Sequence, residues 1–156
     1  MESPTDALPL IAADVVRGVS RLLFRHDFMA LSEVPLANGR RADLMALDGR
    51  GQVIIIEVKV SRADLRGDGK WPDYLDYCDR FFWAVPAGFD LSPFEEAAFR
   101  PECCGLIVAD RYDAAILREA PTRPMPPARR KSELLRFARR AAWRVLATQD
   151  PDLGIV

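Results

Sequence analysis

Histidine is almost absent from this chain of 156 residues, in which His26 stands alone. Cysteine is also scarce, because Cys78 and the adjacent Cys103 and Cys104 give an odd number without any Cys-x-x-Cys spacing. Neither a disulfide framework nor a zinc site is supported, and a histidine-based mechanism has almost no basis. Carboxylate oxygens therefore have few competing nitrogens or thiolates as metal ligands.

Long apolar runs and a charge excess are missing as well. No run approaches the length of a membrane span, and acids at Glu2 and Asp6 stand where a targeting signal has basic residues, so we expect a cytoplasmic protein. The 22 basic and 23 acidic residues nearly cancel, so any nucleic-acid-binding surface has to be local. With 49% hydrophobic and 29% charged residues, the composition is that of one globular domain.

The stretch from Arg41 to Val60 reads as two strands joined by a tight turn. Asp-Gly-Arg-Gly at positions 48–51 supplies the turn, since glycine reaches positive φ at no steric cost and Asp-Gly between apolar runs favours a hairpin. The second strand begins at Val53 and is rich in β-branched residues. A three-residue loop would set Asp43 directly opposite Glu57.

Two carboxylates facing each other across about 5 Å repel unless something neutralises them. A divalent cation would do so, and oxygen ligands suit Mg²⁺ or Mn²⁺. Side chains alternate along a strand, so Lys59 points to the same face as Glu57, about 6.6 Å away. A lysine at this place can orient or activate a water, or stabilise the charge that develops on a phosphate.

The spacing of Asp43 and the Glu57-x-Lys59 motif resembles that of the PD-(D/E)XK nuclease superfamily. Glu33 lies where that superfamily often has an additional upstream acid, while Ala42 replaces the proline of the family name. With the segments 61–65 and 70–85, the chain looks more narrowly like the MmcB-like DNA repair proteins over roughly residues 5 to 148.

The resemblance implies an α/β domain of the restriction-endonuclease-like fold, with a mixed central sheet flanked by helices. It implies that Asp43, Glu57 and Glu33 bind Mg²⁺ or Mn²⁺, and that Asp43, Glu57 and Lys59 are catalytic. The region after the hairpin would border the active site. Candidates there for contacts with nucleic acid are Lys70, Trp71, Tyr74 and Asp79, since aromatic rings beside a lysine can stack on unpaired bases.

In an alternative interpretation, these residues have no catalytic or metal-binding role. Asp43, Glu57 and Lys59 would then form a solvated ion pair across a surface hairpin, and Glu33 would be an ordinary exposed strand residue. Against it, Glu57 and Lys59 interrupt a run that is otherwise apolar on both faces, where isolated charges are costly unless paired or coordinated.

Apolar periodicity and turn residues predict the remaining elements before residue 120. The first is an amphipathic helix over residues 4–25 with Ser3 as its cap. The others are a strand at 28–36, a short helix at 61–69 capped by Ser61, a helix at 70–79, strands at 80–86, 104–110 and 114–118, and a short helix at 93–100.

A proline-rich connector over residues 121–131 separates the nuclease-like core, residues 1–120, from a basic helix within residues 132–156. We expect this helix to begin at Ser132 and to pack on the same domain. Its predicted apolar stripe is Leu134, Leu135, Ala138, Ala141, Ala142 and Val145, and Arg136, Arg140 and Arg144 line up at four-residue spacing. These arginines could bind phosphates, or they could pair with acids elsewhere.

These patterns favour a DNA repair protein that hydrolyses DNA phosphodiester bonds with a divalent metal. A second hypothesis is a catalytically inactive DNA-binding adaptor of a repair complex, and a third is an interaction protein that uses apolar helices. The partners expected are DNA and other repair proteins, and self-association is compatible with each hypothesis.

Overall fold

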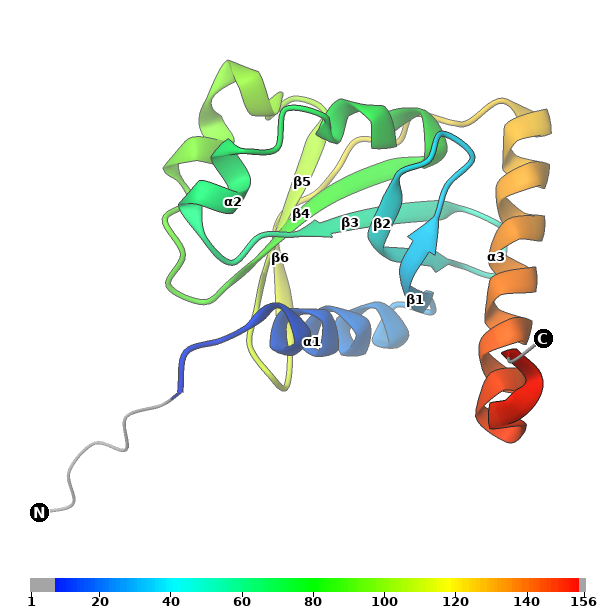
Figure 1. Ribbon diagram of the computed structural model, residues 1–156. Coiled ribbons are helices and arrows are strands. Elements are labelled where there is room, and N and C mark those ends of the chain that lie inside the picture. The colour runs from blue at the N-terminus through cyan, green and yellow to red at the C-terminus, as the bar shows by residue number, and fades with distance from the viewer. Residues whose placement is uncertain (1–7, 155–156) are drawn as a thin grey trace, which may run out of the picture.

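The computed structural model describes residues 8–154 and has one mixed sheet of six strands, flanked by helices (Figure 1). The strands lie side by side in chain order, with β3, β4 and β5 parallel and the other neighbours antiparallel. Their bounds are β1 Met29–Pro35, β2 Arg41–Leu47, β3 Val53–Val58, β4 Arg80–Pro86, β5 Cys104–Ala109 and β6 Ala114–Arg118. The expected α/β fold is confirmed, and the arrangement is consistent with a restriction-endonuclease-like fold.

Helices account for most of the chain outside the sheet. The α-helices are α1 Ala12–Arg25, α2 Arg62–Arg66 and α3 Pro127–Gln149. The 3₁₀-helices are η1 Trp71–Tyr77, η2 Ser92–Glu95, η3 Ala97–Phe99 and η4 Pro151–Gly154. Among the described residues, no helix combines the length and hydrophobicity that crossing a bilayer requires.

The sheet is covered on both faces. Helix α1 lies against one face of the sheet (Figure 1). Its apolar stripe packs there on alternate residues of β2, β3 and β4. The other face carries an aromatic cluster from β4 and the 3₁₀ segments, in which the ring of Trp83 lies 5.2 Å from those of Trp71 and Phe81. Strand β3 is therefore buried on both sides, which explains its nearly continuous apolar sequence.

Helix α1 begins later than its apolar periodicity predicts. It starts at Ala12, and the Asp14 carboxylate accepts the backbone N–H of Ile11 at 2.9 Å, which satisfies a donor at the helix start. The predicted cap at Ser3 lies outside the described residues. The apolar side chains that fix the helix on the sheet, Val15, Val19, Leu22 and Leu23, all lie after this start.

The turn between β2 and β3 confirms the predicted register. Asp48 and Gln52 pair at the base of the loop, and the Asp48 carboxylate accepts the N–H groups of Arg50 and Gln52, each at 2.9 Å. Gly51 has φ +81°, a conformation that suits glycine. From here the ladder runs through Leu47–Val53 to Leu44–Ile56, so that the next opposing positions are 43 and 57.

Helix α3 differs from its predicted form in both its start and its orientation. It begins at Pro127, five residues before Ser132, because proline at the first helical position lacks only an N–H that would be unpaired anyway. Glu133 and Phe137 are buried against the domain, whereas Leu135 and Val145 from the predicted stripe are 55% and 57% exposed. The helix therefore packs through a different face, which also carries Arg130, Arg140 and Arg144.

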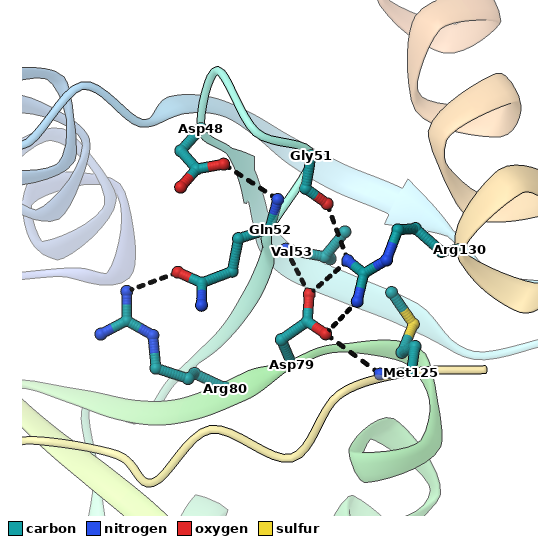
Figure 2. Close-up of polar contacts among 8 residues, drawn as sticks. All are labelled: Asp48, Gly51, Gln52, Val53, Asp79, Arg80, Met125 and Arg130. Carbon is teal, nitrogen blue, oxygen red and sulfur yellow. Dashed lines mark hydrogen bonds and ion pairs between the residues drawn. The ribbon is translucent and has the colours of Figure 1, made fainter. Parts of the chain in front are cut away.

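Asp79 joins four parts of the chain and explains how α3 is held (Figure 2). Its buried carboxylate accepts the N–H groups of Val53 at 2.8 Å and Met125 at 3.0 Å, and it binds Arg130 through two bonds of 2.5 and 2.7 Å. Burial alone would raise the pKa of Asp79, but these bonds outweigh it and lower the pKa. The prediction that Asp79 contacts substrate is therefore wrong, because both oxygens of its buried carboxylate are already hydrogen-bonded within the fold.

Candidate active site

Asp43 and Glu57 lie opposite each other where the ladder between β2 and β3 ends. Glu57 Oε1 accepts the Asp43 N–H at 3.0 Å, and Asp43 Oδ2 accepts the Val58 N–H at 2.8 Å. Each carboxylate thus bonds to the backbone of the opposite strand, just beyond the last ladder pair, Leu44–Ile56. This exchange fixes both side chains, and Glu57 is only 4% exposed.

Two carboxylates this close to each other repel when both are ionised. Burial, and then the negative charge of Asp43, raise the pKa of Glu57 from 4.5 to about 9. The charge of Lys59 opposes this shift but is a smaller influence. Near neutral pH Glu57 therefore keeps its proton, unless a cation bound beside it takes the place of that proton.

Lys59 is buried just beyond the end of β3, where its backbone N–H continues the pairing with β4 by donating to Ala84 O at 3.0 Å. Its ammonium lies 2.9 Å from Asp68 Oδ2 and 3.7 Å from Asp64 Oδ1. Burial, the largest single influence, lowers the pKa of Lys59, but the carboxylates of Asp68, Asp64 and Glu57 outweigh it, so the pKa is raised. Lys59 is accordingly a cation at neutral pH and not a free base.

Asp64 and Asp68 were not among the predicted site residues. Ser61 caps α2 as predicted, because its Oγ accepts the Asp64 N–H at 3.1 Å. The available signal was the pair of acids at four-residue spacing directly after the Glu-x-Lys motif. Spacing alone does not show that the chain turns back to bring both carboxylates to the lysine.

A cavity of about 520 Å³ opens over these groups. Helix α1 forms one wall with small apolar side chains, and strands β1 to β3 form the other. The residues that line it are Ala12, Ala13, Val16, Ser32, Glu33, Asp43, Glu57, Val58, Lys59 and Asp64. The structure therefore brings together all four predicted acid and lysine positions and adds Asp64.

Glu33 occupies the rim of the cavity in an unusual backbone conformation. It lies between the pairs Ser32–Leu44 and Val34–Ala42, which sets it across from Asp43, and its φ is +51°. Positive φ is uncommon for a residue other than glycine and costs conformational energy. The Glu33 side chain is largely exposed and lies 3.9 Å from Arg41 Nη2.

The donor set suits a hard divalent cation with few protein ligands. Over residues 8–154, no three His, Cys, Asp or Glu side chains are gathered closely enough to hold a metal by themselves. Asp43 and Glu57 supply two adjacent carboxylates, and Mg²⁺ is commonly bound by one or two carboxylates together with water and substrate phosphates. Glu33 would have to turn inward from the rim to contribute.

Two of the predicted nucleic-acid contacts are wrong, because their rings are in the core. Trp71 is 2% exposed among Phe81 and Trp83, and Tyr74 is 8% exposed and donates its O–H to Arg41 O at 3.0 Å. Neither ring can stack on a base. Lys70, just before η1, is exposed to solvent, and its contact with nucleic acid stays a prediction.

The three arginines predicted to bind phosphates do not form one exposed row. Arg136 is exposed and lies 3.9 Å from the Glu133 carboxylate. Arg140 is half-buried, with its guanidinium 4.9 Å from the centre of the Trp143 ring. Arg144 donates to the backbone carbonyls of Ser32 and Glu33, so it fastens α3 to β1 beside the cavity.

The chain is similar to known proteins in sequence and in fold. A family model described as DNA repair protein MmcB-like matches residues 5–152. A solved structure of the SPO1766 protein of unknown function from Silicibacter pomeroyi has 42% sequence identity and a TM-score of 0.81, over 96% of this chain and 97% of that one. No curated protein matches the chain. The family match spans nearly the whole sequence, and the chain belongs to the MmcB-like DNA repair protein family.

Proposed function

We propose that this DNA repair protein hydrolyses phosphodiester bonds of DNA with the help of Mg²⁺ or Mn²⁺ at the Asp43–Glu57 pair. The observation that carries the proposal is a buried carboxylate, Glu57, facing the half-buried carboxylate of Asp43, with the buried ammonium of Lys59 on the same cavity. Such a pair is destabilising by itself, and a divalent cation would convert the repulsion into binding.

The residues take distinct roles in this proposal. Asp43 and Glu57 would hold the metal, which when bound would polarise a phosphate oxygen and lower the pKa of a bound water. Lys59 would stabilise negative charge that develops on the phosphate, because its ammonium stays protonated beside Asp68. Asp68 would act as a positioning residue, since it fixes the direction of the lysine side chain.

Metal binding and cleavage can be tested together. Mn²⁺ is titrated by calorimetry into wild type, Asp43→Asn and Lys59→Met, and each protein is then incubated with labelled single-stranded, duplex, flap and nicked DNA. We expect only Asp43→Asn to lose metal binding, and both variants to lose cleavage. Asp76→Asn is the matched control, because Asp76 is exposed and outside the cavity.

A second function is favoured by one specific observation. The ammonium of Lys59 already has two carboxylate neighbours, Asp64 and Asp68, and so resembles a structural ion pair as much as a catalytic one. A protein that binds DNA without metal and retains full affinity in Lys59→Met would be a DNA-binding adaptor in a repair complex. Wild-type cleavage that depends on metal would exclude this alternative.

A further inference from the structure

A second cavity, of about 640 Å³, lies on the outer face of α1 beside the tip of the β5–β6 hairpin. It combines positive charge with exposed aromatic rings. Its lining consists of Arg17, Ser20, Arg21, Phe24, Arg25 and Tyr112. We call this group the α1–hairpin surface.

A close approach of backbone to backbone builds this surface. A Cβ atom added at Gly18 would lie 2.1 Å from Asp110 O and 2.6 Å from Asp113 O, so glycine is what lets the hairpin tip touch α1. The Asp110 carboxylate accepts the N–H groups of Tyr112 and Asp113 at 2.7 and 2.9 Å, which fixes the turn. Tyr112 is thereby held above the helix, with Arg21 Nη1 donating to its carbonyl at 3.3 Å.

The chemistry of the surface suits unpaired bases and phosphates. Phe24 and Tyr112 are each 67% exposed, and the Arg17 guanidinium lies 6.0 Å from the centre of the Tyr112 ring. Arg17, Arg21 and Arg25 recur at four-residue spacing, about 6 Å apart along the helix axis. Aromatic rings within a positively charged groove are the usual means of binding single strands, because every base offers a face for stacking.

Not all of this charge is available. Arg25 is paired with Asp113 at 2.5 Å, so it contributes little. Arg17 and Arg21 form no ion pair with any acid among residues 8–154. Asp14, the acid of α1 nearest in sequence to Arg17, is occupied by Arg111 at 3.3 Å. Two guanidinium groups are therefore left to meet phosphates.

The α1–hairpin surface and the candidate active site share one side of α1. Ala13 lines the acid cavity, and Arg17, Ser20 and Phe24 follow it at four-, three- and four-residue steps, so all four lie on one side of the helix. The path from Ala13 to Phe24 is roughly 16 Å at 1.5 Å per residue. Both cavities therefore open along the same side of α1.

We propose that the α1–hairpin surface binds single-stranded DNA that continues from the candidate active site. Phe24 and Tyr112 stack on bases, and Arg17 and Arg21 contact phosphates. Paired bases cannot offer their faces to these rings, so the surface selects unpaired strands over duplex. The position of the strand relative to the acid pair rests on the proposed nuclease function, whereas binding itself requires neither metal nor cleavage.

Fluorescence anisotropy with a labelled thymidine oligonucleotide in EDTA tests the proposal. Substituting both rings, Phe24→Ala with Tyr112→Ala, should weaken single-strand binding at least about 10-fold, given the usual contribution of a stacked base. Substituting both cations, Arg17→Gln with Arg21→Gln, should weaken it and reduce the salt dependence by about 1.4 logarithmic units per decade. The control is Arg50→Gln with Arg139→Gln, which removes two exposed charges elsewhere.

These binding measurements test the α1–hairpin surface separately from the proposed nuclease function. Unchanged affinity in the ring variant, equally tight binding of duplex, or no binding by wild type at low salt would each overturn it. Melting curves of the variants establish that they are folded, and the Tyr112→Phe variant, which keeps the ring, should bind as wild type does. Single-strand binding through this surface without any metal-dependent cleavage would support the proposal and refute the nuclease function.

Discussion

The pH dependence of folding in the metal-free protein tests the carboxylate pair most directly, and Glu57→Gln isolates it. Burial and the charge of Asp43 raise the pKa of Glu57 from 4.5 to about 9. A carboxyl group with a higher pKa in the folded state stabilises the fold fully below pH 4.5, and this contribution is lost as the pH rises towards 9. The free energy of unfolding of wild type should therefore fall across this interval.

The size of the effect follows from the pKa difference. One pKa unit corresponds to about 1.36 kcal/mol, so the whole interval amounts to at most about 6 kcal/mol. The surroundings can relax around the ionised Glu57 carboxylate, so we expect a loss of ~2 kcal/mol or more. Mn²⁺ at 100 times its Kd should return about 2.7 kcal/mol at the alkaline end.

Urea unfolding followed by tryptophan fluorescence in EDTA, from about pH 5 to about pH 9, measures this loss. Glu57→Gln keeps an oxygen that can accept the Asp43 N–H but carries no charge, so its profile should be flatter than that of wild type. At the alkaline end the variant should be the more stable protein. A flat wild-type profile, or equal slopes in the two proteins, would refute the electrostatic account. Asp76→Asn should reproduce the wild-type slope.

Three further variants test the fold and the roles of individual residues. Asp79→Asn leaves Arg130 without its carboxylate and should cost about 3 kcal/mol, measured by urea unfolding, the low end for a broken buried pair because Arg130 keeps some solvent access. Gly18→Ala should lower the Tm by several degrees, corresponding to about 1–3 kcal/mol, since its Cβ would meet Asp110 O. Lys59→Met should reduce cleavage at least about 100-fold while Mn²⁺ affinity stays within a few-fold; unchanged cleavage would remove the lysine from the mechanism.

Local patterns in the sequence were sufficient to predict the β2–β3 hairpin and the register of its two strands. The Asp-Gly-Arg-Gly turn allows only a short loop, and a short loop leaves one pairing that buries the β-branched residues. The facing of Asp43 and Glu57 follows from that pairing alone. The fold class was predictable for the same reason, since strand and helix periods repeat along the chain and need no knowledge of distant contacts.

The orientation of α3 could not be predicted in this way. A helical period identifies a stripe of apolar residues, but it does not say which side of the helix meets the domain. Arg144 packs inward because backbone carbonyls of Ser32 and Glu33 accept its protons, and Arg130 does so because Asp79 lies 2.5 Å away. Acceptors of this kind lie tens of residues away in the chain and leave no pattern near the arginines.

The protonation state of Lys59 could likewise not be predicted from the sequence, although its position beside Glu57 could. The Glu-x-Lys spacing allowed the lysine either to activate a water or to stabilise charge, and these roles require different protonation states. The turn of α2 brings Asp68 to 2.9 Å from the ammonium and holds the lysine protonated. The choice between the two roles is therefore made by the segment after the motif, and any proton acceptor in the reaction has to be a group other than Lys59.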